Sequence, residues 1–141
     1  LAGVPRCIFG SFDGYKRAIE IADSPNIGMC LCVGCWLEGG ALMGKDVVET
    51  LRYFAERKKL FKVHFRNVTA PMPEGFAETY MDAGYYDMFR IVQVLQEVGF
   101  DGAIMSDHLP KMVGGARAAE AYGVAYMKAL VNAARSCREG E

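Results

Sequence analysis

The stretch IGMCLC at residues 27–32 is a short apolar run that lies between turn-forming residues. The sequence DSPN at residues 23–26 precedes it, and Gly34 follows it closely. An apolar run of this length with proline and glycine at its flanks is typical of a strand that is buried on both faces of a parallel sheet. The stretch therefore predicts an α/β protein with a parallel sheet.

Helices and strands alternate around this stretch. Apolar residues recur at three- and four-residue spacing, which predicts helices over residues 12–22, 46–58, 87–99 and 116–138. Further apolar runs predict strands over residues 60–68 and 103–106. Four glycines predict a loop after the first strand, namely Gly34, Gly39, Gly40 and Gly44. One helix followed by three strand–helix units indicates parallel βα architecture.

Three strands are too few to close a barrel, and an open sheet of this size leaves two apolar edges unpaired. A complete (β/α)8 barrel takes about 250 residues, whereas the chain has 141. We therefore expect residues 1–141 to form a single partial barrel domain, the C-terminal part of a TIM barrel with three strands and four helices, without the N-terminal strands. The alternative is a small open α/β sheet that completes itself by dimerising.

The composition limits the classes of partner. Lys and Arg total 16 against 17 Asp and Glu, and 52% of the residues are hydrophobic. A net charge of -1 provides no basic surface for nucleic acid, and no apolar run approaches the roughly 20 residues of a membrane helix. The five cysteines are an odd number, and nothing at the start of the chain reads as a secretion signal. We expect a soluble, cytoplasmic protein without nucleic-acid or membrane partners.

Residues with metal-binding atoms stand at the C-terminal end of each predicted strand: Cys32, His64 and Asp107. In parallel α/β folds the ligand site lies at this end, where the loops to the helices begin. A cysteine, a histidine and an aspartate that arrive there from successive strands predict a mononuclear metal site. Structural alternatives are a small buried hydrophobe for Cys32 and a core histidine for His64. An ionised Asp107 after an apolar strand needs a partner or a metal.

The sequence Cys32-Val-Gly-Cys35 also matches the CxxC pattern of redox pairs and zinc sites. A redox pair is expected at the N-terminus of a helix, whereas here Cys32 ends a predicted strand and a glycine-rich loop is predicted to follow. A structural zinc site would need a second pair of ligands, and Cys7 and Cys137 each stand alone. The sequence therefore favours neither interpretation.

Short motifs in a fixed order carry a resemblance to a known family. They are Gly3-Val-Pro-Arg6, Asp23-Ser-Pro25, Gly28-Met-Cys-Leu-Cys-Val-Gly34, His64-Phe-Arg-Asn-Val68, Phe76-Ala-Glu78, Gly84-Tyr-Tyr-Asp-Met88 and Ser106-Asp-His108. Through these motifs nearly the whole chain resembles the mannonate dehydratases, metal-dependent enzymes of hexuronate catabolism with a xylose-isomerase-like barrel. The resemblance implies that the chain is the C-terminal half of such an enzyme.

The resemblance also implies a set of metal ligands. In that family Mn²⁺ or Fe²⁺ is held by a histidine from an earlier strand and by a cysteine, a histidine and an aspartate from the next three. The resemblance places the last three ligands on Cys32, His64 and Asp107, and the first histidine before Leu1. A thiolate ligand would also suit Zn²⁺, which the resemblance makes the less expected metal.

The reaction implied by the resemblance is that of a carbon–oxygen lyase, which converts D-mannonate to 2-dehydro-3-deoxy-D-gluconate and water. His108 is the predicted acid–base residue. Arg66 and Asn67 are predicted to bind the carboxylate and hydroxyls of the sugar acid, with a structural ion pair as the alternative for Arg66. Glu78 lies in the long loop of residues 69–86 and is predicted either to bind substrate hydroxyls or to order that loop.

The chain departs from the family pattern after Asp107-His108. Many family members carry Gly-Arg there and later a segment that supplies a catalytic tyrosine, whereas this chain has Leu109-Pro-Lys-Met112. Tyr122 and Tyr126 lie nearby, and whether either is catalytic stays open. The alternatives to the dehydratase are a sugar isomerase or epimerase of the same barrel superfamily and a non-catalytic half-barrel association module. We expect the intact enzyme to be a homo-oligomer and the isolated chain to have little activity.

Overall fold

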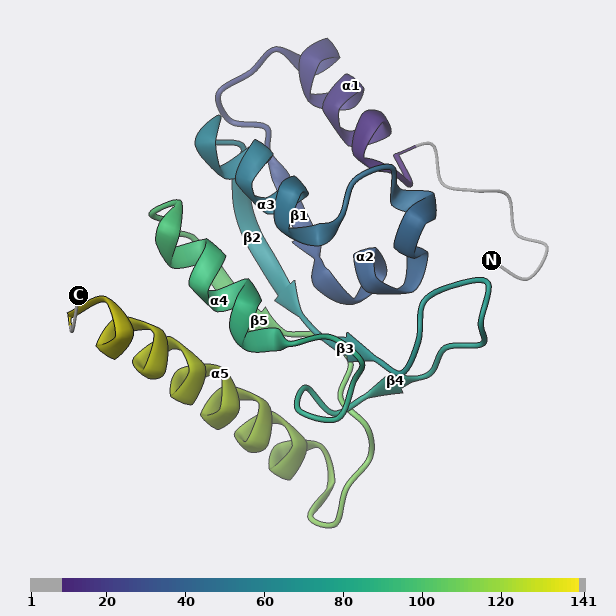
Figure 1. Cartoon of the computed structure of the whole chain (residues 1–141), viewed down its shortest axis with the longest axis vertical. Helices are drawn as coiled ribbons and strands as arrows, with labels where there is room; N and C mark the ends of the chain where they lie inside the picture. Colours follow the sequence, from purple (N-terminus) through teal and green to yellow (C-terminus); the bar gives the residue numbers. More distant parts are fainter. Residues whose placement is uncertain (1–8, 140–141) are drawn as a thin grey trace.

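The computed structural model describes residues 9–139 and alternates helices and strands as the sequence predicts (Figure 1). The motif at residues 3–6 lies outside the described residues. None of the described helices is long and apolar enough to cross a membrane. The elements follow in the order α1 (Phe12–Ala22), β1 (Met29–Cys32), α2 (Val33–Gly39), the 3-10 helix η1 (Gly40–Met43), α3 (Val47–Glu56), β2 (Leu60–Phe65), β3 (Asn67–Val68), β4 (Glu78–Thr79), α4 (Met88–Glu97), β5 (Ala103–Ser106) and α5 (Gly115–Glu139).

Three parallel strands form the main sheet, in the spatial order β1-β2-β5. Leu31 on β1 pairs with Val63 on β2, and Val63 pairs with Ile104 on β5. Leu31 and Val63 are fully buried, and helices α3 and α4 lie in front of the strands in Figure 1. A parallel sheet with helices packed on it confirms the predicted α/β fold.

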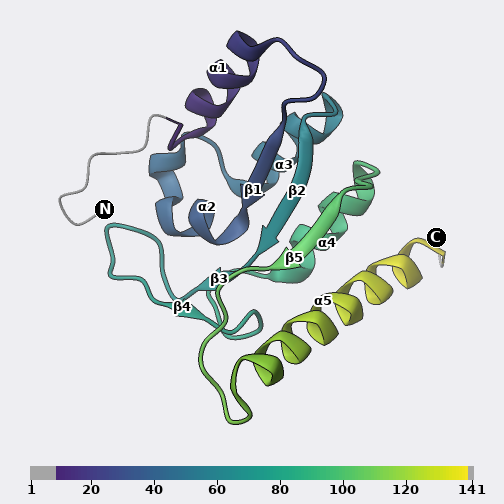
Figure 2. The same ribbon diagram turned by 180° about the vertical axis from the view of Figure 1, so that it is seen from behind.

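No helix in the described part of the chain lies over the opposite face of the sheet. Cys32, His64 and Met105, each one residue further along its strand, pair with one another across the sheet, and none of them is buried. Figure 2 shows the strands from this side, with α3 and α4 behind them. The prediction of a strand buried on both faces is therefore wrong for the described chain. In a (β/α)8 barrel this face lines the interior, which the side chains of all the strands fill together.

Side-chain caps determine where three of the predicted helices begin. Ser11 caps α1 by accepting a hydrogen bond from a backbone N–H in its first turn, and Asp87 caps α4 in the same way. Asp46 and Glu49 form a capping box at α3, in which each side chain accepts from the backbone N–H of the other residue. These bonds satisfy N–H groups that have no partner inside the helix. The predicted starts of these helices are confirmed.

The glycine-rich segment after β1 differs from the prediction. The sequence predicted a loop, but residues 33–43 form α2 and η1, so the described chain has five α-helices rather than four. Trp36 and Leu37 on α2 are buried, and this apolar burial outweighs the low helix propensity of glycine. Gly34 allows a close approach rather than a turn, because a Cβ there would lie 2.6 Å from the guanidinium carbon of Arg66.

The strand predicted over residues 60–68 is divided in two. β2 ends at Phe65, and the next two strand residues form β3, which pairs antiparallel with β4. The break at Arg66 takes the chain out of the parallel sheet, and β3 and β4 lie beyond the carboxyl ends of the strands in both views (Figures 1 and 2). The long loop is therefore anchored next to the end of the sheet where the predicted site residues stand.

Candidate metal centre

Three side chains with metal-binding atoms meet at the carboxyl end of the sheet. Cys32 and His64 pair directly across β1 and β2, and Asp107 follows the last residue of β5. One ligand atom from each residue lies within 4.8 Å of those from the other two. The parallel register explains this meeting, because neighbouring parallel strands end at the same edge of the sheet. The structure thus brings together all three predicted ligands.

Arg66 pairs with three carboxylates, one of which belongs to the candidate ligand Asp107. Its side chain is 3% exposed, and Nε donates to Asp107 Oδ2 at 3.0 Å. Nη1 forms ion pairs with Glu38 and, at 3.2 Å, with Glu78. Burial lowers the pKa of Arg66, but the hydrogen bond to Glu38 and the neighbouring groups outweigh it and raise the pKa above its usual value. The guanidinium is therefore a fixed positive charge beside the candidate ligands.

The structural ion pair that the sequence left open for Arg66 is present. Its remaining nitrogen, Nη2, faces Cys32 Sγ and Cys35 Sγ, each at 3.6 Å. A substrate carboxylate would have to replace one of these partners to reach the guanidinium. Direct substrate binding by Arg66 stays a prediction.

Asp107 is held in its ionised form. Burial raises the pKa of its carboxyl group, but hydrogen bonds from Arg66 at 3.0 Å and from Cys32 Sγ at 3.4 Å outweigh burial and keep the pKa below its usual range. The other carboxylate oxygen lies 3.7 Å from His64 Nδ1. A charged carboxylate beside a thiol and an imidazole is a donor set that divalent transition metals accept. The residues present therefore fit a divalent metal ion.

Cys32 is also the N-cap residue of α2. Its Sγ accepts a hydrogen bond from the backbone N–H of Cys35 at 3.3 Å. Hydrogen bonding between the two side chains raises the pKa of Cys32 and lowers that of Cys35. The CxxC motif therefore stands at the N-terminus of a helix, where the sequence predicted a loop. The predicted loop after Cys32, which was the argument against a redox pair, is therefore wrong.

His108 and Glu78 lie together at the open side of the site. The side chain of His108 is 66% exposed, and its Nδ1 lies 2.6 Å from Glu78 Oε1. The hydrogen bond to Glu78 raises the pKa of His108. The other ring nitrogen, Nε2, lies 3.6 Å from Asp107 Oδ1, so it points toward the candidate ligands. The structure thus joins two predicted site residues that are thirty positions apart in the sequence.

Asn67 is fully buried and holds the long loop. Its amide donates to the backbone carbonyls of Met81 and Tyr86 at 3.0 and 2.9 Å. Gly84 packs so closely that a Cβ there would lie 2.1 Å from the amide. These contacts use both amide protons, so a contact with substrate hydroxyls by Asn67 stays a prediction.

Known proteins resemble the chain both in sequence and in structure. The family model of D-mannonate dehydratase matches residues 1–137, which is nearly the whole chain. The chain belongs to the D-mannonate dehydratase family. Proteins named mannonate dehydratase from Thermotoga neapolitana and Streptococcus uberis are 30% and 33% identical to it over 130 residues. These alignments cover 91% of this chain but 34% and 36% of the relatives, so the chain spans about a third of the curated relatives' length.

Two solved structures share the fold of this mannonate dehydratase family member. The crystal structure of mannonate dehydratase from Streptococcus suis serotype 2 matches with a TM-score of 0.76 at 26% identity, over 91% of this chain and 38% of that chain. A xylose isomerase domain protein from Planctomyces limnophilus matches with a TM-score of 0.65 at 18% identity, over 89% and 43% of the two chains. The second match shows likeness of fold alone. Together they confirm the prediction of a partial TIM barrel.

Glu38 is a residue of the candidate metal centre that the sequence analysis missed. It stands on α2 and forms an ion pair with Arg66. It was missed because the segment was predicted to be a loop. The signal that would have found it is the three-residue spacing from Cys35, which places both residues on one side of a helix that Cys32 caps.

The two tyrosines considered for catalysis stand on α5. The hydroxyl of Tyr122 donates to Asp82 Oδ1 at 2.6 Å, and burial together with this bond raises the pKa of Tyr122 to about 12. Its ring stacks with Tyr126 at a centroid distance of 6.1 Å. These contacts link Tyr122 to the long loop.

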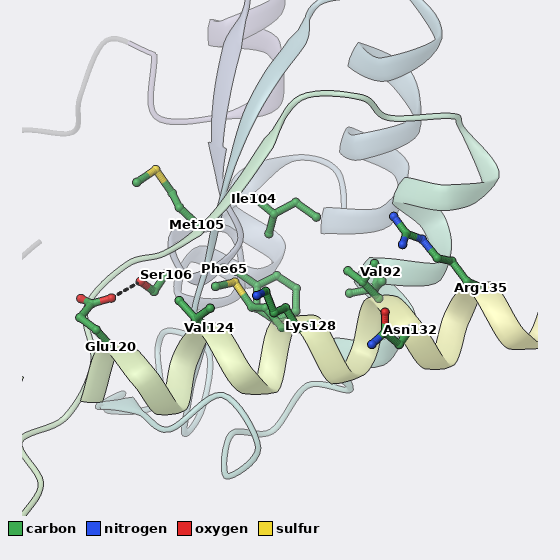
Figure 3. A pocket seen from close by; sticks show the side chains of 12 residues that line it. Phe65, Val92, Ile104, Met105, Ser106, Glu120, Val124, Lys128, Asn132 and Arg135 are labelled. Atoms are coloured by element: carbon green, nitrogen blue, oxygen red, sulfur yellow. Dashed lines mark hydrogen bonds between the residues drawn. The ribbon is translucent and has the colours of Figure 1, made fainter. Parts of the chain in front are cut away.

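A cavity of about 770 Å³ lies between β5 and α5, apart from the candidate ligands (Figure 3). Its walls include the apolar side chains of Phe65 and Ile104, and Ser106 donates to Glu120 at 2.8 Å across one end. None of the three candidate ligands lines it. The cavity lies beside β5, whose one partner in the described sheet is β2, so it is the type of groove that a further strand fills in a barrel.

Proposed function

We propose that the chain carries the cysteine, histidine and aspartate ligands of a metal-dependent D-mannonate dehydratase. The enzyme converts D-mannonate, a small sugar acid of hexuronate catabolism, to 2-dehydro-3-deoxy-D-gluconate and water. The observation that carries the proposal is the meeting of Cys32, His64 and Asp107 within 4.8 Å, in a chain that belongs to this family. The free thiols of the described chain suit a reducing compartment such as the cytoplasm.

Cys32, His64 and Asp107 are the residues that would hold Mn²⁺ or Fe²⁺. A bound divalent cation supplies Lewis-acid stabilisation of negative charge on the oxygens of the substrate. This chemistry suits the reaction, because removing the proton beside the carboxylate of a sugar acid leaves a costly carbanion. The thiol also suits Zn²⁺ on softness grounds, so a comparison of metals belongs to the test.

His108 is the proposed proton-transfer residue. The hydrogen bond to Glu78 occupies Nδ1, which leaves Nε2 to exchange a proton with the substrate near the candidate ligands. Because Glu78 raises the pKa of His108, the ring keeps its proton to a higher pH than an ordinary histidine. A protonated ring donates to the departing hydroxyl group, which then leaves as water.

Arg66 provides the positive charge that a sugar-acid carboxylate requires. It is buried and lies next to Glu78 at the open side of the site. We assign contacts with the substrate to Arg66 and Glu78 together, since Glu78 pairs with both Arg66 and the exposed His108. Asn67 acts through the long loop, because its two hydrogen bonds hold the segment that follows Glu78.

The test is an assay for 2-keto-3-deoxy acid in the complete protein that contains this chain, with D-mannonate and Mn²⁺, Fe²⁺ or Zn²⁺. We expect product with metal and none after treatment with a chelator. Cys32→Ala and Asp107→Asn each remove a ligand, so each should lower kcat/KM by at least about 100-fold. The matched control is Cys30→Ser, two residues earlier on β1, which should retain activity.

Full activity in both ligand variants would overturn the metal assignment. A metal-dependent product that still contains all the atoms of its substrate would indicate the isomerase or epimerase instead. The isolated 141-residue chain spans about a third of its curated relatives, and we expect little or no turnover from it.

A further inference from the structure

The dehydration proposed above uses one cysteine of the CxxC motif, and the second has no role in it. Cys32 caps α2, and Cys35 is the third residue of that helix. Cys32 has the extended backbone of an N-cap residue rather than a helical one, and a Cys-X-X-Cys pair at the start of a helix is the arrangement of disulfide oxidoreductases. The backbone therefore holds the two cysteines where a disulfide can form.

The two sulfur atoms face the same neighbours. Arg66 Nη2 lies 3.6 Å from each of them, and the backbone N–H of Cys35 points at Cys32 Sγ from 3.3 Å. Gly34, between the cysteines, makes room for the guanidinium that both sulfurs contact. Both side chains thus point to the same place rather than to opposite sides of the helix.

The two cysteines differ in access. Cys35 is exposed, whereas Cys32 is partly covered and donates to Asp107 at 3.4 Å. A small oxidant from solution therefore reaches Cys35 first. Cys32 then stands next to the oxidised sulfur and is the nearest thiol along this turn.

We propose that Cys32 and Cys35 are a redox modification site, which peroxides convert to a reversible disulfide. Its consequence for metal rests on the proposed function, because a sulfur in a disulfide no longer serves as a thiolate ligand beside His64 and Asp107. Formation of the disulfide itself does not depend on that function. The motif thus links the oxidation state of the cell to the metal-binding capacity of the site.

The reaction balances with hydrogen peroxide as the oxidant. The sulfur of Cys35 attacks one peroxide oxygen, so that an S–O bond forms, the O–O bond breaks and one water leaves with a sulfenic acid on Cys35. The sulfur of Cys32 then attacks the sulfenic sulfur, the S–S bond forms, the S–O bond breaks and a second water leaves. The two thiols lose two electrons and two protons, and the peroxide gains them.

Cys30 is the cysteine that most needs to be distinguished from this pair. It lies two residues before Cys32 on β1 and is exposed. An extended strand separates the Cα atoms of such neighbours by about 6.6 Å and keeps their side chains parallel, which disfavours a disulfide between them. Replacement of Cys30 is therefore the matched control for replacement of Cys35.

The experiment treats the reduced, metal-free 141-residue chain with hydrogen peroxide, blocks the remaining thiols with a maleimide and identifies the bonds by peptide mass spectrometry. We expect a Cys32–Cys35 disulfide in the unaltered chain and in Cys30→Ser. In Cys35→Ser, Cys32 should remain open to the maleimide. A disulfide that involves Cys30, bonds between chains, or a free Cys32 beside an over-oxidised Cys35 would overturn the proposal.

A second measurement separates this proposal from the proposed function. Co²⁺ is added to the reduced and the oxidised chain, and its thiolate charge-transfer absorption is recorded. We expect oxidation to lower the absorption at least tenfold, a thiol reductant to restore it, and Cys35→Ser to keep it after the same exposure to peroxide. No absorption in the reduced chain, together with a normal disulfide, would count against the metal site alone. Unchanged absorption after complete disulfide formation would contradict the proposed link.

Discussion

The part of the molecule built by β1, β2, α3 and α4 is well packed, whereas the part built by β5 and α5 is open. Two of the four residues of β1 are buried and none of the four residues of β5. β1 and β5 each have one partner in the described sheet, namely β2, so pairing does not explain the difference. In a βα barrel each helix packs between its own strand and the next one. α5 has no next strand in the described sheet, and the side of α5 that faces the cavity of Figure 3 carries both apolar and charged side chains.

The candidate metal centre lies on the boundary between these two parts. Cys32 and His64 come from the packed strands, and Asp107 comes from the end of β5. Arg66 follows β2 and bonds to Asp107, so its side chain joins the end of β5 to the packed part, in addition to the pairing of β2 with β5. The comparison implies that substitutions in the packed part change the global free energy of unfolding. Substitutions at the boundary should also change the arrangement of the candidate ligands.

The largest effect is expected from a core truncation in the packed part. Phe54 on α3 is 1% exposed and contacts the rings of Phe12 and Tyr53. Phe54→Ala should lower the free energy of unfolding by about 3–5 kcal/mol, since it removes buried apolar area and leaves a cavity. The measurement is urea unfolding followed by fluorescence of Trp36, the one tryptophan of the chain.

The matched variant in the open part is Val124→Ala on α5. Val124 is 43% exposed, so its truncation should change the free energy of unfolding by less than about 0.5 kcal/mol. Equal losses in the two variants would show that α5 packs as tightly as α3, and the comparison would fail.

The next largest effect is expected at the boundary. Arg66→Ala leaves Glu38 and Asp107 without their buried cation and should cost about 3 kcal/mol, the lower end of the range for a broken buried pair, because the carboxylates retain some access to water. Arg66→Lys keeps the charge but cannot reach carboxylates and thiols at once, so it should lose less. Amide hydrogen exchange should show the loss first in the segment after β5. If amide protection in the segment after β5 is the same in Arg66→Ala as in the unaltered chain, the linking role of Arg66 is contradicted.

Most of the architecture follows from local patterns. The strand at IGMCLC, the helices capped by Ser11, Asp46 and Asp87, and the order of the units all follow from apolar spacing and turn-forming residues, which report short-range structure. The same is true of the three candidate ligands, because their position at strand ends is a local property. The parallel register then brings them together.

Other features depend on contacts that no local pattern contains. Gly34 reads as a loop residue, but its purpose is to make room for Arg66, which is 32 positions away in the sequence. Helix α2 was missed for this reason, and with it Glu38 and the helical position of the CxxC motif. Likewise, the amide of Asn67 is used by backbone carbonyls of the long loop. The sequence alone identified Arg66 and Asn67 as candidate site residues without showing that long-range packing already occupies them.

The pH dependence of the free energy of unfolding tests the ionised state of Asp107 at the boundary between the two parts. Its pKa lies below the value of about 3.9 expected in the unfolded chain. The folded state therefore gains stability from this group above about pH 4, and loses it as the pH falls through the lower folded value. Asp107→Asn removes this gain, so the difference between the two chains should be constant near neutral pH and shrink below about pH 4. The measurement is urea unfolding from pH 7 downward in the presence of a chelator, and a difference that grows on acidification would contradict the assignment.

The smallest effect is expected from the capping box of α3. Asp46→Ala removes the side-chain acceptor for the N–H of Glu49, and such a cap contributes about 1 kcal/mol. Because α3 belongs to the packed part, this loss should appear in the global free energy of unfolding. The matched variant is Glu120→Ala, which removes the bond to Ser106 that joins α5 to β5. That bond is exposed, so its loss should change global stability by less than about 0.5 kcal/mol while increasing exchange at β5. Equal losses of global stability in the two variants would mean that β5 and α5 unfold together with the rest of the chain. The packed and open parts would then form one cooperative unit, and the comparison would fail.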